Sequence, residues 1–205
     1  MKGRVIVVGG HSRGVGKTAL SVALVRALAP RAVATVKVSA HRHGAGHLAI
    51  EEDTTPVLST STGRCLAAGA ARAFLCRCPD ARLHEVAVLV RLLASGGYDV
   101  VVESNRMAPL VDAALTLFVT SSATADWKAS SDMCLARADA IVLAPGSIVP
   151  ARARRVAAVH RRLLLPVLRF ESSWGIPALP RWIDTLARGD WPRPAATMHA
   201  LPAPA

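Results

Sequence analysis

The sequence predicts an α/β protein built on a doubly wound, mainly parallel sheet with helices on both faces. Short β-branched apolar runs alternate along the chain with segments whose apolar residues recur at helical spacing. One run, at 98–102, is nearly continuous in Val, which is typical of a strand covered on both faces. Alternation of this kind favours parallel strands joined by helical crossovers.

The elements can be placed in chain order. A strand at 4–8 ends in Gly9 and Gly10, and a helix follows at 17–28, before Pro30. Further strands are expected at 32–38, 73–78, 98–102, 115–119, 140–143 and 167–170. Further helices are expected to end near 71 and to lie at 84–93, 130–136 and 152–163. After the expected strand at 32–38, a His- and Gly-rich loop at 40–49 and an acidic, Thr-rich stretch at 51–62 predict one irregular segment that is mobile without ligand.

Length and composition indicate one folded domain with an extension. The chain has 205 residues, of which 52% are apolar and 4% aromatic, so Ala, Val and Leu should build the core. We expect the domain to span 1–171. The extension, 172–205, should hold a short helix near 181–187 and a Pro/Ala-rich, disordered tail.

The charge balance raises the question of anionic partners. The net charge is +11 and the pI is near 10.9, values that also occur in nucleic-acid-binding proteins. Only four residues are Lys, whereas Arg is scattered through every region, which indicates compositional drift and disfavours nucleic acid. No apolar stretch reaches the roughly 18 to 20 residues of a membrane span, so no membrane partner is expected.

The four cysteines, Cys65, Cys76, Cys78 and Cys134, form no CxxC pair. The N-terminus does not resemble a signal peptide. We therefore expect reduced thiols in a cytoplasmic protein, buried for structural reasons and not bound to metal.

Residues 10–18, Gly-His-Ser-Arg-Gly-Val-Gly-Lys-Thr, join the first strand to the first helix. Gly14 and Gly16 would let main-chain N–H groups surround phosphate oxygens at the helix N-terminus. Lys17 would reach the β- and γ-phosphates, and the Thr18 hydroxyl would bind Mg²⁺. The strict pattern has its first Gly one position later, so this is a variant phosphate loop. It predicts binding of ATP or GTP with Mg²⁺ by Gly10, His11, Ser12, Arg13, Gly14, Val15, Gly16, Lys17 and Thr18.

Carboxylates and imidazoles elsewhere are candidate ligands. Glu103 ends a strand at the carboxyl edge, where ligands of open α/β sheets bind, and could hold Mg²⁺ directly or through water. Asp53, with Glu51 beside it, could also approach the metal. The loop with His41, His43 and His47 could bind a transition metal, contact an anionic substrate or face solvent.

Residues 4–105 resemble a branch of the P-loop NTPases that contains dethiobiotin synthetase and the molybdopterin-guanine dinucleotide biosynthesis adaptor protein B. The loop at 10–18 is similar to the synthetase's G-T-D-T-x-V-G-K-T. The strand that runs into Lys37 and the later histidines is similar to the adaptor's I-K-H-T-H-H. Residues 53–70 resemble its D-S-x-R-x-x-x-A-G-A, and the strand ending at Glu103 resembles L-V-E-G in both.

This resemblance implies phosphate and Mg²⁺ binding at the loop, with Lys37 near the γ-phosphate or substrate and Glu103 at the metal. The candidate catalytic residues are then Lys17, Lys37 and Glu103, and the candidate metal ligands Thr18, Glu103 and Asp53.

The chain departs from these families at several positions. Ser12 replaces the Asp of the synthetase loop, and Ser-Asn-Arg follows Glu103 in place of Gly-Ala-Gly-Gly. Position 12 also lacks the signature Lys of partition and arsenite-pump ATPases, which weakens the case for a sandwich dimer, although Arg13 could take over that task. A homodimer stays open. Residues 126–128, Asp-Trp-Lys, lack the guanine-selecting Asn-Lys-x-Asp, so ATP and GTP both stay open.

Three functions fit these observations. The first is a slow NTPase in cofactor biosynthesis, similar to the molybdopterin adaptor. The second is an ATP-dependent enzyme acting on a small anionic substrate, similar to dethiobiotin synthetase, in which Lys37 and the His loop bind the substrate and Arg106 clamps it. The third is a regulatory or metal-chaperone switch in which nucleotide orders residues 40–60 for a partner.

Overall fold

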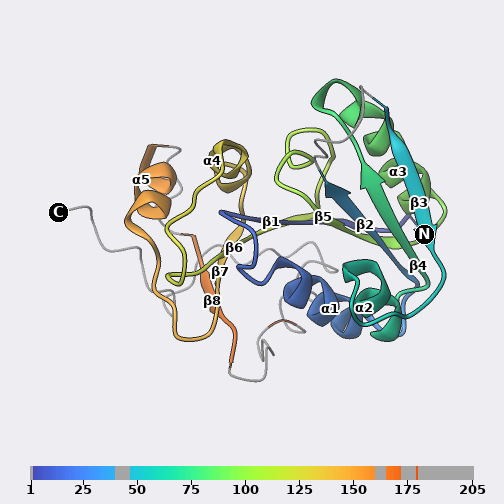
Figure 1. The fold of residues 1–205 in the computed structure, drawn as a ribbon, viewed down its shortest axis with the longest axis horizontal. Helices are drawn as coiled ribbons and strands as arrows, with labels where there is room; N and C mark the ends of the chain where they lie inside the picture. Colours follow the sequence, from blue (N-terminus) through green and yellow to red (C-terminus); the bar gives the residue numbers. More distant parts are fainter. Residues whose placement is uncertain (1, 40–46, 160–164, 172–178, 180–205) are drawn as a thin grey trace.

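An eight-stranded sheet organises the chain in the computed structural model, which describes residues 2–39, 47–159, 165–171 and 179 (Figure 1). The strand order is β3-β4-β2-β5-β1-β6-β7-β8. The strands are β1 (Val5–Gly10), β2 (Val33–Ser39), β3 (Ala49–Asp53), β4 (Arg72–Arg77), β5 (Asp99–Glu103), β6 (Leu115–Thr120), β7 (Ala140–Leu143) and β8 (Val167–Arg169). The helices are α1 (Lys17–Leu28), α2 (Ser61–Ala67), a short 3-10 turn η1 (Asp80–Arg82), α3 (Leu83–Ser95), α4 (Ala129–Leu135) and α5 (Ala151–Val159).

All neighbouring strands are parallel except β3 and β4. The chain leaves central β1 in one direction to form β2, and it later crosses to the other side of β1 to form β6, β7 and β8. The carboxyl ends of β1 and its two neighbours therefore meet where the order of the sheet reverses, the usual place for a ligand in this class.

The helices cover both faces of the sheet, as the alternation of strand side chains requires. Val5 and Val7 pack in one core with residues of α3, α4 and α5, whereas Ile6 and Val8 pack in the other with α1 and α2. Figure 1 shows α1 and α2 below the strands and the other helices above them. The predicted doubly wound, mainly parallel class is confirmed.

The prediction of an irregular segment over 51–62 was wrong at both ends. Ala49–Asp53 forms the antiparallel edge strand β3, and α2 begins at Ser61. Charged pairs support this edge, because Glu51 binds Arg77 and Glu52 binds Arg72 on the adjacent strand. A strand stabilised by cross-strand charges carries no apolar alternation, so its sequence shows no strand pattern.

At the amino edge of the sheet, two arginines hold a carboxylate buried at the start of β5. Asp99 is fully buried, and it accepts hydrogen bonds from the Arg4 main chain at 2.9 Å, the Arg4 guanidinium at 2.6 Å and the Arg31 guanidinium at 2.6 Å. Burial alone would raise the pKa of Asp99, but the arginine bonds outweigh it and the pKa is lowered. Asp99 thus ties the strand to two neighbouring segments.

The remaining expectations fall partly within the described residues. All four cysteines are buried free thiols, as expected, and burial raises the pKa of Cys65 to about 11 and of Cys76 to about 12. No described helix combines the length and apolar character that crossing a membrane requires. The end of the predicted helix at 160–163 and the predicted extension, apart from buried Leu179, lie outside the described part of the chain.

Candidate functional site

The glycine-rich loop joins the end of β1 to the start of α1, as the sequence predicts. Gly14 has φ +77° and Gly16 has φ +106°, both in the left-handed region that side chains disfavour. An added Cβ at Gly14 would meet nothing within 4 Å, so the loop is open on that side. The main chain therefore curls at the N-terminus of α1, as a phosphate-binding loop does.

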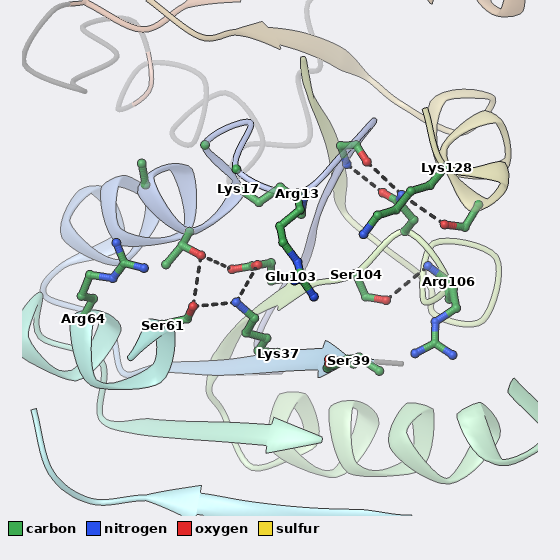
Figure 2. A pocket seen from close by; sticks show the side chains of 18 residues that line it. Arg13, Lys17, Lys37, Ser39, Ser61, Arg64, Glu103, Ser104, Arg106 and Lys128 are labelled. Atoms are coloured by element: carbon green, nitrogen blue, oxygen red, sulfur yellow. Dashed lines mark hydrogen bonds and ion pairs between the residues drawn. The ribbon is translucent and has the colours of Figure 1, made fainter. Parts of the chain in front are cut away.

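This loop forms one wall of a cavity of about 920 Å³ at the carboxyl edge of the sheet. Figure 2 shows Glu103 between Lys17 and Lys37, with Arg64 to one side and Arg106 to the other. Among the described residues, the lining contains a single carboxylate, Glu103, and six basic side chains: Arg13, Lys17, Lys37, Arg64, Arg106 and Lys128. Such a cavity is built for an anion with more than one charge.

Lys17 lies folded against its own loop. Its ammonium donates to the Ser12 carbonyl oxygen, which closes the loop across its base. Desolvation lowers the pKa of Lys17 to about 8; nearby Glu103 opposes the shift, whereas Lys128 and Lys37 add to it. The negative charge of an incoming oxyanion would offset both the cost of desolvating the Lys17 ammonium and the repulsion from the other two ammonium groups.

Glu103 connects the loop to β2 and α2. One carboxylate oxygen accepts a hydrogen bond from the Thr18 hydroxyl at 2.9 Å, and the other lies 3.1 Å from the Lys37 ammonium. Lys37 also donates to the Ser61 hydroxyl at 2.6 Å, and that hydroxyl lies 3.3 Å from the Thr18 hydroxyl. The network brings together three of the five predicted catalytic and metal residues, Lys37, Thr18 and Glu103. A hydroxyl beside a carboxylate is a set of hard oxygen donors that suits Mg²⁺.

Asn105 fixes the start of the loop from the neighbouring strand. Its side-chain oxygen accepts from the Gly10 N–H at 2.7 Å, and its amide nitrogen donates to the Gly10 carbonyl at 2.9 Å. Backbone pairing between β1 and β5 ends at Val8 and Glu103. The Asn105 side chain therefore extends the ladder by one further step and holds the last residue of β1 in line.

The side chains of three predicted loop residues point away from the cavity. His11 is 1% exposed, stacks on Trp127 at 5.3 Å between ring centroids, and has a pKa lowered chiefly by desolvation. Ser12 donates to Asp126 at 2.6 Å, and Val15 is buried in the core beside α1. Only the main chain of these residues is available to a ligand in this arrangement.

In the described part of the chain, no hydrogen bond joins Asp53 or His47 to Thr18 or Glu103, although the cavity that Asp53 lines also contains Lys37 and Ser61. The Asp53 carboxylate accepts from the Thr55 main chain at 3.1 Å and the Thr62 hydroxyl at 2.9 Å, and it lines a smaller cavity beside the edge strand. His47 is exposed, and His41 and His43 lie outside the described residues. Within the described ranges, no three His, Cys, Asp or Glu side chains come together as a metal site.

Several cavity residues were not predicted from the sequence: Ser39, Ser61, Arg64, Ser104, Asn105 and Lys128. Ser104, Asn105 and Lys128 each follow a strand at its carboxyl end, in loops after β5 and β6. This position was a usable signal, because all such loops meet at the same edge. Ser61 and Arg64 lie on α2, whose start no pattern marked.

The known proteins offer little guidance to this site. Neither a protein-family model nor a curated protein sequence matches the chain. Among solved structures, a ParA family ATPase from Chlorobium tepidum TLS is similar at a TM-score of 0.36 and 12% identity, over 91% of this chain and 80% of that one.

Proposed function

We propose that the chain binds a nucleoside triphosphate with Mg²⁺ in the cavity above the glycine-rich loop. The observation that carries the proposal is the coincidence of four features at one strand-to-helix junction. Gly14 and Gly16 have positive φ, the Lys17 ammonium bridges the loop, the Thr18 hydroxyl meets Glu103, and five other basic side chains line the same cavity. A glycine-rich turn that only capped a helix would explain the glycines alone.

Each group has a defined task in this proposal. Main-chain N–H groups from 10 to 18 and the Lys17 ammonium bind the β- and γ-phosphates. The Thr18 hydroxyl and the Glu103 carboxylate hold Mg²⁺, and Lys37 orients that carboxylate through its ion pair. When bound, Mg²⁺ supplies charge neutralisation across the β- and γ-phosphates. Turnover by this set relies on positioning and charge stabilisation.

A finer proposal concerns the pathway. The sequence resemblance supports a weak NTPase in cofactor biosynthesis, in the manner of the molybdopterin adaptor, acting in the cytoplasm. The size and charge of the cavity favour instead an ATP-dependent enzyme on a small anionic substrate. Release of ADP or GDP that depends on added substrate supports the enzyme. Nucleotide-dependent capture of a protein without turnover supports the third candidate function, a regulatory or metal-chaperone switch controlled by nucleotide.

Calorimetry tests the central proposal. Wild-type protein is titrated with the non-hydrolysable analogues of ATP and GTP, AMPPNP and GMPPNP, with Mg²⁺ and with EDTA. We expect Lys17→Ala to weaken binding by about 100-fold, because it removes a charge-assisted contact to phosphate in a desolvated site. The matched control is Lys2→Ala, an exposed lysine that lines a different cavity. Equal affinity of Lys17→Ala and wild type would sink the proposal.

A further inference from the structure

The cavity carries more positive charge than a nucleotide can balance. Six basic side chains and one carboxylate line it among the described residues, so its formal charge is five positive when Lys17 is protonated. A triphosphate with one Mg²⁺ carries about two negative charges. About three positive charges remain; Asp80, which pairs with Arg106 from outside the lining, is exposed and offsets only part of one of them. Because close like charges in a partly desolvated site repel strongly, such a surplus indicates a second anion.

The basic side chains that supply this excess positive charge come from both faces of the sheet. Thr18, Ser61 and Arg64 belong to α1 and α2, which cover one face. Arg106 instead contacts residues at the entry to α3, and Lys128 directly precedes α4, both on the other face. Since the loop opens α1 and Thr18 lies in its first turn, the triphosphate occupies the first side. Figure 2 shows Arg106 and Lys128 to the right of Glu103, and this second side is left for another group.

Arg106 is held in place but not fully paired. One terminal nitrogen, Nη1, donates to the Cys78 carbonyl at 3.2 Å and to the Asp80 carboxylate. The Arg106 side chain is 15% exposed, whereas Asp80 is 81% exposed, so solvent screens that ion pair. The other terminal nitrogen, Nη2, is buried and has no hydrogen-bond partner. A buried donor without a partner is costly, and an oxyanion is the group that would satisfy it after a small shift of the guanidinium.

Two further groups complete this corner of the cavity. The Ser104 hydroxyl oxygen accepts from the Arg106 main chain at 3.2 Å, which leaves its own proton free to be donated. The Lys128 ammonium has no hydrogen-bond or carboxylate partner among the described residues, and it lies close enough to Lys17 to help lower the pKa of that residue. One hydroxyl, one guanidinium and one ammonium thus border the same space.

We propose that Ser104, Arg106 and Lys128 form a subsite for a second small oxyanion, which is bound while the glycine-rich loop holds the triphosphate. The ligand is a phosphate- or carboxylate-bearing small molecule, placed on the side of Glu103 where Arg106 and Lys128 lie. The inference rests on the proposed nucleotide site and deepens it, because it assigns the chemical class of the partner substrate.

The test uses full-length protein saturated with Mg·AMPPNP, so that the loop is filled. Inorganic phosphate and succinate are titrated separately by calorimetry. We expect one equivalent of at least one probe to bind, and the tighter probe distinguishes a phosphate-bearing from a carboxylate-bearing ligand. Arg106→Gln and Lys128→Gln should each weaken that binding by about tenfold. The same variants should change AMPPNP affinity by much less than they change probe affinity.

Controls separate this inference from the function on which it rests. Arg152→Gln removes an equal charge from an arginine that does not line the cavity and pairs with Asp132, and it should bind both ligands as wild type does. Thermal unfolding of each variant confirms folding. If AMPPNP itself does not bind, the proposed function fails. If AMPPNP binds but neither probe does, or if both cavity variants bind the probe as Arg152→Gln does, the subsite is overturned and the nucleotide site stands.

Discussion

Strand β5 begins and ends with a carboxylate, and its two ends have opposite characters. Asp99 at the amino end is completely buried, and its oxygens are occupied by Arg4 and Arg31. Glu103 at the carboxyl end is 10% exposed and faces a large cavity, where it touches one hydroxyl and one ammonium. The same strand therefore holds one acid whose bonds are complete and one whose partners can be exchanged.

The difference shows how burial and partner type divide structural from functional acids. A buried carboxylate between two guanidiniums has fixed partners, and breaking the set leaves buried or misplaced charge. A carboxylate beside a hydroxyl and a flexible lysine can turn toward a cation without leaving another group unpaired. Stability should depend mainly on the amino end of β5, and ligand binding mainly on the carboxyl end.

The largest expected effect lies at the amino end. Asp99→Asn removes the charge that holds Arg4 and Arg31, and we expect the free energy of unfolding to fall by about 3 kcal/mol. Urea denaturation measures this loss. Glu85→Gln, which breaks a half-exposed ion pair with Arg82, is the control and should cost less than about 1 kcal/mol. AMPPNP affinity of the folded Asp99→Asn protein should equal that of wild type; a parallel loss of binding would erase the contrast between the two ends.

A second, somewhat smaller effect is expected where structure and site meet. Asn105→Ala leaves the N–H and the carbonyl of Gly10 without their main partners, so we expect a loss of about 2 kcal/mol in unfolding free energy. Asn105→Asp keeps the acceptor but loses the donor, and should lie between Ala and wild type. AMPPNP affinity should fall in the same order, because the loop starts at Gly10. An Asp variant as unstable as the Ala variant would show that the ladder extension is not what Asn105 provides.

Much of this contrast could be predicted from the sequence, and the rest could not, for physical reasons. The run into Gly9 and Gly10 and the helical spacing after Lys17 fixed the first strand, the loop and the first helix, since these are local signals. The placement of Glu103 at a strand end also followed from its position after an apolar run. These predictions needed only neighbouring residues.

The missed features depend on partners distant in the chain. Asn105 is informative only once it lies beside Gly10, and Asp99 only once Arg4 and Arg31 converge on it. The inward turn of His11 depends on Trp127, more than a hundred residues later. The edge strand β3 depends on arginines of β4. Tertiary pairings of polar side chains leave no periodic trace, so a pattern along one segment cannot reveal them.

At the carboxyl end, a mutation of Glu103 should change metal dependence more than stability. We expect Glu103→Gln to weaken Mg·AMPPNP binding by about tenfold, because a neutral amide is a poorer Mg²⁺ ligand. In EDTA the same variant should bind AMPPNP at least as tightly as wild type, since a negative charge near the phosphates has been removed. Its unfolding free energy should change by less than about 1 kcal/mol. A loss of the size expected for Asp99→Asn would make Glu103 a structural acid as well.

The smallest effect concerns the pH dependence of nucleotide binding through the Lys17 ammonium. Because the pKa of Lys17 in the free protein is about 8, the phosphate-binding charge is present below that pH and is lost above it. Affinity for Mg·AMPPNP should therefore fall about fourfold from pH 7 to pH 8.5, with proton uptake on binding that calorimetry in buffers of different ionisation enthalpy can measure. Lys17→Arg keeps its charge throughout this range. Its affinity for Mg·AMPPNP should be equal to or weaker than that of wild type and should not change with pH.

Glu103 raises the pKa of Lys17, so Glu103→Gln should move the fall in affinity to lower pH. Asp99→Asn, at the other end of the strand, should not change the pH at which the affinity falls. A pH profile that moves equally in both variants would mean that the two ends of β5 are electrostatically coupled and not separate.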